Sequence, residues 1–200
     1  KLSKISFKIS KLILLNGFNI QIKSISSTII SLIELRKIQS FDNPSIIIAT
    51  HILNVQLLEF GSIFSYSYGI INSILIPRYE NQDILKKKLY YWGSFISIFI
   101  SILQSSFYFF IIIFTNNRII INEYRNILPI TILYQIVFTF TCINEGMIQG
   151  YQKYNTVTYS SIISLFVSVL SISYSKSLKD IWISMVIKNI TKLLFYYINL

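Results

Sequence analysis

Five ionisable side chains lie inside stretches of sequence that are otherwise almost entirely apolar, and they are the first candidates for a functional role. They are Lys23, Glu59, Glu145, Lys188 and Lys192. A charged side chain at the centre of a bilayer costs about 3 kcal/mol or more, so such residues usually face a cavity, water or a partner charge. A carboxylate in a low-dielectric cavity takes up a proton more readily than one in water. Glu59 and Glu145 are therefore the plausible ion-coupling groups.

The positions of these residues predict how they pair. At about 1.5 Å per residue, Lys23 lies near the middle of the first apolar segment and Glu59 near the middle of the second. The two segments are antiparallel with a short connection, so we expect this pair to meet, either to fix helix register or to take part in transport. Glu145 lies close to the end of the fourth segment. It is either solvated there or paired with Lys192, which shares a helical face with Lys188.

Uncharged polar side chains are spread along the first two segments. Such side chains are typical of the wall of a water-filled or substrate-filled cavity, whereas lipid-exposed helices rarely carry them. The predicted cavity-lining residues are Asn16, Asn19, Asn54, Gln56 and Asn72. His51 begins the second segment, where we expect it at headgroup level or as a cap. Close helix contacts are expected from serines, because glycine and alanine are scarce. The candidates are Ser24, Ser26, Ser27, Ser31, Ser160, Ser161, Ser164, Ser168 and Ser171.

The segments that must position these residues are long and apolar. The chain is 53% hydrophobic and 13% charged, and residues 89–117 and 154–175 contain no Asp, Glu, Lys or Arg. Soluble domains carry about 25% charged residues, and about 20 helical residues cross a hydrocarbon core. Runs such as residues 107–114 lack the alternation of a membrane β-barrel. We therefore predict an all-α membrane bundle of about six helices. Its spans are about 12–35, 46–76, 89–114, 127–149, 156–174 and 181–200.

Basic residues indicate the orientation of these spans, because cytoplasmic loops are enriched in Lys and Arg. Nine lie in the basic segment 1–11 and in the loops after the second and fourth spans, against six in the other loops. This distribution favours cytoplasmic N- and C-termini. The net charge of +10 is therefore interpreted as membrane topology, not as nucleic-acid binding. The chain begins with Lys1 instead of Met, so we expect it to be a piece of a longer protein.

Cysteine and histidine are too few for several kinds of chemistry. The chain has one cysteine, Cys142, and one histidine, His51. The single cysteine leaves no disulfide framework and no thiolate metal cluster, and the single histidine removes most zinc sites and most Ser-His-Asp arrangements. We expect neither an enzyme nor a bound cofactor or metal, and the lipid bilayer is the first expected partner.

Four short motifs follow one another along the chain. Asn16-Gly17 is followed by Lys23, Ala49-Thr50-His51 by Gln56, Glu145-Gly146 by Gly150, and Trp182 by Lys192. Their order resembles the second half of a transporter of the multidrug and toxic compound extrusion (MATE) family, in its DNA-damage-inducible-protein-F-like branch. The segment 76–80 departs from the Val-Gly-Gln turn usual there, and Glu59 has no counterpart in that branch.

The resemblance implies a function and a missing partner. It implies one lobe of a 12-helix exporter, whose two six-helix lobes rock to expose a central cavity alternately. Inward flow of H+ or Na+ would drive small organic, often cationic, compounds outward. The N-terminal six-helix half would then lie on the same precursor chain. Two alternatives remain open: a lipid-linked sugar flippase of similar fold, and a non-transporting structural membrane subunit whose buried charges hold helices together.

Overall fold

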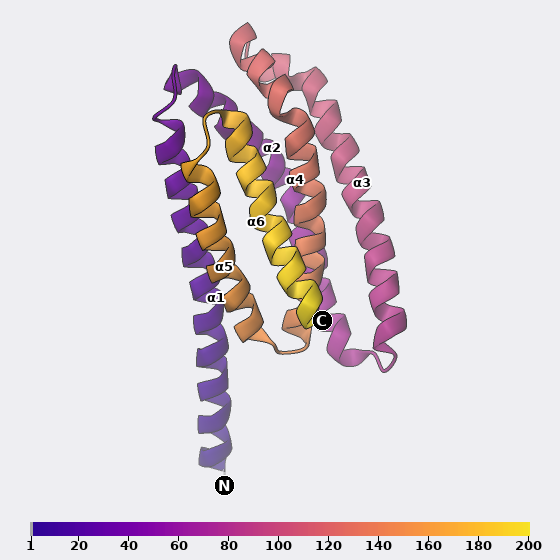
Figure 1. Ribbon diagram of the computed structural model, residues 1–200. Coiled ribbons are helices and arrows are strands. Elements are labelled where there is room, and N and C mark those ends of the chain that lie inside the picture. Colours follow the sequence, from indigo (N-terminus) through magenta and orange to yellow (C-terminus); the bar gives the residue numbers. More distant parts are fainter. Residues whose placement is uncertain (1) are drawn as a thin grey trace.

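The protein is a bundle of long α-helices (Figure 1). The computed structural model describes residues 2–200, except for the side chains of residues 2–6, 8, 110 and 112. The elements are α1 (Leu2–Ile38), α2 (Pro44–Leu75), the 3-10 turn η1 (Ile76–Arg78), α3 (Gln82–Phe114), α4 (Arg118–Gly150), α5 (Tyr154–Ser173) and α6 (Leu178–Asn199). The described part contains no strand, so the predicted all-α fold is confirmed. Lys1 and the side chains of Lys4 and Lys8, from the predicted basic segment 1–11, lie outside the described residues.

Five of these helices, α2 to α6, are long and apolar enough to cross a membrane. Within residues 2–200, α1 is the exception, although it covers the whole predicted first span, 12–35. Its central part carries Asn16, Asn19, Gln21 and Lys23, which lower its mean hydropathy. The first helix of the bundle is thus long enough to span but more polar than the other five.

Local sequence explains where several helices begin. Pro44 occupies the first turn of α2, where its missing N–H is not needed. The side chains of Asn81 and Asn117 accept hydrogen bonds from backbone N–H groups in the first turns of α3 and α4. Ser177 and Asp180 form a capping box at the start of α6. These residues therefore determine where α2, α3, α4 and α6 begin.

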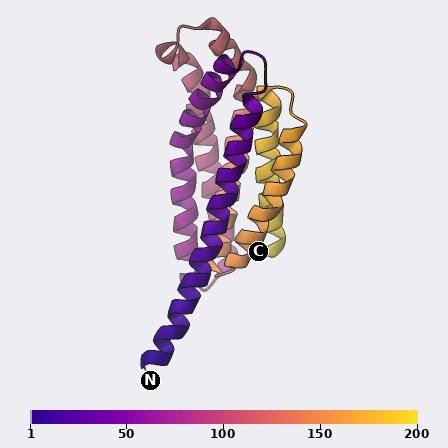
Figure 2. The ribbon, with the colours of Figure 1, turned by 90° about the vertical axis from the view of Figure 1, so that its left-hand side faces the viewer.

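Helix packing does not follow the order along the chain. The central helix is α4, which packs against α2, α3 and α6. The first helix, α1, packs mainly against α5, and α5 packs against α6, whereas α1 and α2 have few contacts although they are consecutive. Figure 1 shows α1 and α5 side by side on one flank and α3 on the other. In Figure 2 the start of α1 extends beyond the rest of the bundle.

Small residues allow the closest helix approaches. Where α2 crosses α4, a Cβ atom on Gly69 would lie 2.7 Å from the carbonyl oxygen of Cys142, and one on Gly146 would collide with the carbonyl oxygen of Gly69. A Cβ atom on Gly150 would lie 2.9 Å from Cβ of Ile76. The serine prediction holds for α5, where the buried serines are Ser160, Ser161, Ser164 and Ser168. It is wrong for most of α1: Ser26 is buried, but Ser24, Ser27 and Ser31 are exposed, because α1 has packing partners on one side only.

Candidate functional site

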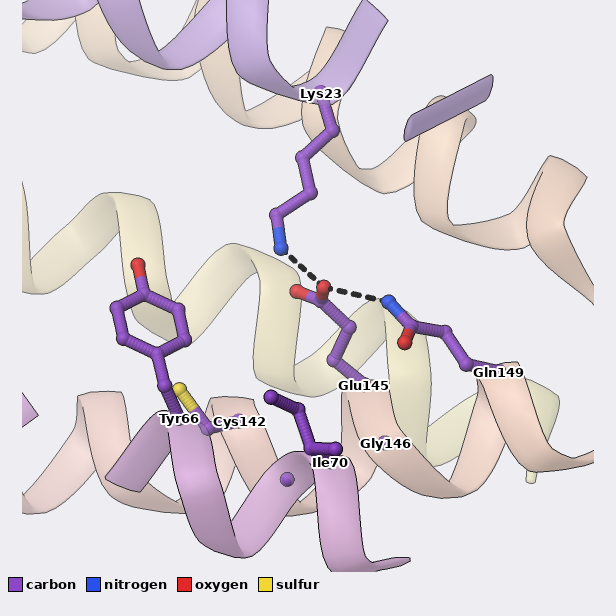
Figure 3. Close-up of a pocket in the computed structure, with 8 residues that line it drawn as sticks. Lys23, Tyr66, Ile70, Cys142, Glu145, Gly146 and Gln149 are labelled. Carbon is purple, nitrogen blue, oxygen red and sulfur yellow. Dashed lines mark hydrogen bonds and ion pairs between the residues drawn. The ribbon is translucent and has the colours of Figure 1, made fainter. Parts of the chain in front are cut away.

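Lys23 of α1 and Glu145 of α4 form an ion pair inside the bundle (Figure 3). The Nζ of Lys23 donates a hydrogen bond to Oε1 of Glu145. The side chain of Lys23 is 27% exposed and that of Glu145 11%, so protein covers most of the pair. This contact joins α1 to the central helix of the bundle.

The predicted pair of Lys23 with Glu59 is wrong. Glu59 is exposed on the surface of α2, whereas Lys23 points toward α4. The reason is that α1 packs on α5 instead of on α2, which turns Lys23 away from the exposed side of α2. Equal depth in two consecutive helices does not imply that two side chains share a direction.

The carboxylate of Glu145 is hydrogen-bonded from three helices. Besides Lys23, Gln149 donates from its Nε2 to Oε1 at 3.0 Å, and the hydroxyl of Tyr196 on α6 donates to Oε2 at 3.3 Å. Both carboxylate oxygens therefore have donors. Glu145 is the point at which α1, α4 and α6 meet.

A small pocket lies beside the ion pair, between α1, α2 and α4 (Figure 3). Its volume is about 120 Å³. The lining residues are Lys23, Tyr66, Gly69, Ile70, Cys142, Glu145, Gly146 and Gln149. Sites for drug-sized molecules have volumes of about 300–1,000 Å³. By itself this pocket therefore admits a small group, not a whole organic substrate.

Lys188 and Lys192 point into the bundle from α6. This helix contacts α5 through Ser184, whose hydroxyl lies 3.3 Å from that of Ser175. It contacts α4 through Tyr196 and through the carbonyl oxygen of Asn189, which accepts from Thr141. Since each residue turns an α-helix by about 100°, both lysines lie between these two sides. Buried Ile181 and Met185 occupy the same sector one and two turns earlier.

Lys192 interacts with Glu145 without a direct bond. The two groups are close enough for electrostatic attraction, and Lys192 is repelled by both Lys23 and Lys188. No ion pair joins Lys192 to any side chain that the structure describes. The position that we predicted for Lys192 beside Glu145 is occupied by Lys23 instead, because the side chain of Lys23 reaches across from α1.

Glu34 is a buried carboxylate that was not predicted from the sequence. It is 3% exposed and lies eleven residues after Lys23, three turns along the same face of α1. Its Oε1 has no hydrogen-bond partner among the described residues, and the opposite charge that attracts it is Lys188. A carboxylate this close to the end of a predicted span is normally solvated, so position along the helix does not identify it. The eleven-residue spacing from Lys23 is the signal that indicates burial.

His51 lies in the interior and not at a span end as predicted. It is 5% exposed, and its ring centroid lies 5.5 Å from that of Trp182 on α6. The Trp182 ring in turn meets Tyr134 edge to face at 5.7 Å. Because α2 begins at Pro44, His51 is two turns inside this helix. Two of the motif positions, far apart in the sequence, are thus in contact.

The five predicted cavity-lining residues separate into three groups. Asn54 and Asn72 are buried, 2% and 0% exposed. Asn19 bonds to α5, where its Oδ1 accepts from the Thr158 hydroxyl at 2.8 Å, and Asn16 is half-buried nearby. Gln56 is exposed on α2. None of the five lines the pocket beside Lys23 and Glu145 in the described structure, but Asn16 and Asn19 line a separate cavity of about 560 Å³ between α1 and the start of α5.

A buried amide network, also missed from the sequence, joins α2, α3 and α4. Gln135 is fully buried, and its Nε2 donates to the hydroxyl of Ser65 at 3.1 Å. Its Oε1 accepts from Nε2 of Gln104 at 3.4 Å, and the hydroxyls of Ser65 and Thr139 are 2.9 Å apart. Each residue is an ordinary polar residue in the sequence, so only the packing of the three helices identifies the network.

Among the side chains that the structure describes, no group of three or more His, Cys, Asp or Glu residues could hold a metal ion.

The helices and their interior charges define an integral, multi-pass membrane protein. The MatE family model matches residues 80–174, just under half of the chain, from the start of α3 through α5. This match supports membership of the MatE family, whose members are transporters. It includes Glu145, Gly146 and Gly150, whereas Lys23 and Lys192 lie outside it. No curated protein and no solved structure matches the chain.

Proposed function

We propose that this chain is one six-helix lobe of a secondary active transporter of the MATE type. The second lobe would be an N-terminal six-helix half on the same precursor chain, and the two would work by alternating access. The match to the MatE model supports this proposal. The ion pair of Lys23 and Glu145 also supports it, because charges inside a bundle with five apolar helices, α2 to α6, are costly unless they serve a function.

The observation that carries the proposal is the ion pair of Lys23 and Glu145. It links α1, which packs on α5, to α4, which packs on α2, α3 and α6. Protonation of Glu145 would remove its negative charge and weaken the bond to Lys23, so that α1 and α4 could take another arrangement. Glu145 is thus the proposed coupling group. H+ is favoured over Na+, because both oxygens of Glu145 already accept hydrogen bonds, whereas a metal cation needs several oxygen ligands at once.

We propose a different role for Glu59, on the exposed side of α2. It is exposed near the middle of α2, where contact with lipid would cost about 3 kcal/mol or more. We assign its side of α2 to the water-filled cavity between the two lobes. Glu59 would then face substrate or solvent, not a helix of this lobe.

The substrate proposed from the family resemblance is a small organic, often cationic, compound that moves outward. The competing function is a structural membrane subunit in which the same ion pair only holds helices together. The two differ in one property: the transporter must move a solute when an ion gradient is applied.

The full-length protein that contains this chain can be tested in proteoliposomes with an imposed pH gradient. The probes are ethidium, an organic cation, and carboxyfluorescein, an organic anion. Gradient-driven movement of either probe is expected, and Glu145→Gln should reduce it at least tenfold. Glu80→Gln, which changes an exposed carboxylate before α3, is the matched control. Unchanged, still pH-dependent movement in Glu145→Gln would remove this residue as the coupling group, and movement of neither probe by the wild type would favour the structural subunit.

A further inference from the structure

The first helix of the bundle projects beyond the helix on which it packs. Asn19 donates from its Nδ2 to Oδ1 of Asn155 at 3.0 Å. Eighteen residues later, Lys37 donates from its Nζ to the carbonyl oxygen of Ser173 at 3.2 Å. The partners are 136 residues apart in both bonds, so α1 and α5 run parallel in a constant register. In this register residues 2–17 lie before the first residue of α5 and extend about 24 Å past it (Figure 2).

The level at which α5 begins coincides with one boundary of the hydrocarbon core. At about 1.5 Å per residue, the 20 residues of α5 match a core of about 30 Å. The projecting part of α1 therefore starts where acyl chains give way to headgroups. Among its described side chains, the exposed large apolar ones are Phe7, Ile9, Leu12, Ile13, Leu14 and Leu15.

A cavity of about 560 Å³ lies where the projecting part of α1 meets the turn between α4 and α5. Its wall on α1 carries three large apolar side chains, and its opposite wall is mainly polar. The apolar residues are Leu12, Leu15 and Phe18, and the polar ones include Gln152, Lys153 and Asn155. One wall thus suits hydrocarbon, and the other suits a group that accepts hydrogen bonds.

Lysines supply positive charge to this cavity. Lys11 is exposed and lies four residues before Leu15 and seven before Phe18, which are the spacings of one helix face. In the sequence, Lys8 precedes Leu15 by seven residues. On the opposite wall, Lys153 is exposed and donates one hydrogen bond to the end of α6, which leaves two of its three N–H groups for a ligand. None of the described residues that line the cavity is acidic, so the lysines there attract an anion.

We propose that this cavity binds an anionic phospholipid, with the phosphate between Lys11 and Lys153 and the acyl chains along Leu15 and Phe18. The compact charge and three donors of a lysine suit a phosphate, and lysines at a membrane surface attract anionic lipids. From Lys11 to Phe18, α1 passes from charge to apolar surface in the order in which a lipid passes from headgroup to acyl chain. The bound lipid would brace the start of α1 against the turn between α4 and α5. This inference needs the membrane location of the chain and not its transport activity.

Native mass spectrometry of the purified full-length protein tests the proposal. The protein is released from micelles that contain phosphatidylglycerol and phosphatidylcholine with the same acyl chains, in equal amounts. We expect phosphatidylglycerol to be retained at least tenfold more than phosphatidylcholine. Lys11→Gln combined with Lys153→Gln should remove this preference, Lys11→Gln alone should weaken it, and Lys11→Arg should keep it. Lys176→Gln combined with Lys179→Gln removes two exposed charges from the turn at the other end of α5 and should leave the preference unchanged.

A phosphatidylglycerol with a photoreactive diazirine in one acyl chain locates the bound lipid. We expect it to label peptides that contain residues 12–18 or 152–156, and we expect the label to be lost when Lys11 and Lys153 are both replaced by Gln. Equal retention of the two lipids, an unchanged preference in that double variant, or labelling only elsewhere would overturn the proposal. Labelling only elsewhere is the result expected if the second lobe covers the cavity. Displacement of the lipid by an equal concentration of glycerol 3-phosphate would also overturn it, because the ligand would then be a soluble phosphate.

Discussion

The contact of Lys23 with Glu145 can be measured by a double-mutant cycle on the free energy of unfolding. Breaking a fully buried ion pair costs about 3–5 kcal/mol, because it leaves one charge without compensation. Water reaches this pair in part, since the side chains are 27% and 11% exposed, and this screening lowers the cost. The two single substitutions should also differ, because the partners left behind differ.

Lys23→Met should lower the free energy of unfolding by about 2 kcal/mol, since Gln149 and Tyr196 still donate to Glu145. Glu145→Gln should cost about 3 kcal/mol, because Lys23 and Lys192 both lose their attracting charge. The double variant should be less destabilised than the sum of the two, by about 1–2 kcal/mol.

The assay is unfolding of the full-length protein in mixed micelles of neutral and anionic detergent, followed by circular dichroism. Lys179→Met, which removes an exposed lysine of α6, controls for the change in net charge and should stay within about 0.5 kcal/mol of the wild type. Strictly additive effects of Lys23→Met and Glu145→Gln would refute the contact. The same result would also remove the basis for coupling through Glu145.

Two further predictions concern helix packing, each measured as the change in unfolding free energy in the same micelles. Gly146→Ala should cost about 2 kcal/mol, because its Cβ would collide with Gly69. Gly17→Ala, with open space around it, should cost nothing and should gain up to about 1 kcal/mol, because Ala favours a helix interior over Gly. Equal effects of the two substitutions would contradict the close crossing. Gln135→Leu should cost about 1 kcal/mol, since Gln104 loses its hydrogen-bond acceptor. If Gln135→Leu instead stabilised the protein, the amide network would not support the fold.

Much of the architecture could be predicted from the sequence because hydropathy and breaker residues report position along the membrane normal. The predicted spans 46–76, 127–149 and 181–200 end within one residue of the ends of α2, α4 and α6. Their starts differ more, because caps such as Asn117 start a helix well before its most apolar part. The sequence therefore predicts where a residue lies along its helix axis to within a few turns.

The sequence does not predict how each helix is rotated about its own axis or which helices pack against each other. Lys23 and Glu59 have similar depths, but α1 packs on α5, so the two side chains face different directions. Glu34 was missed because a carboxylate near a span end is normally solvated, and here the side of α1 that also carries Lys23 is turned inward. Hydropathy averages over the faces of a helix, and the pairing of charges depends on single faces.

The polar character of α1 also has a consequence for biosynthesis. Of the six helices α1 to α6, α1 leaves the ribosome before the other five, yet Lys23 is expensive to insert alone, at about 2.5–3.5 kcal/mol for a lysine at mid-membrane. The partner of that lysine lies 122 residues later in the chain, and the hydrogen-bond partners of Asn19 on α5 lie 136 and 139 residues later. Translation of α4 and α5 must be complete before α1 has its full set of contacts. Membrane integration of this lobe is therefore expected to finish with the helix that is made first.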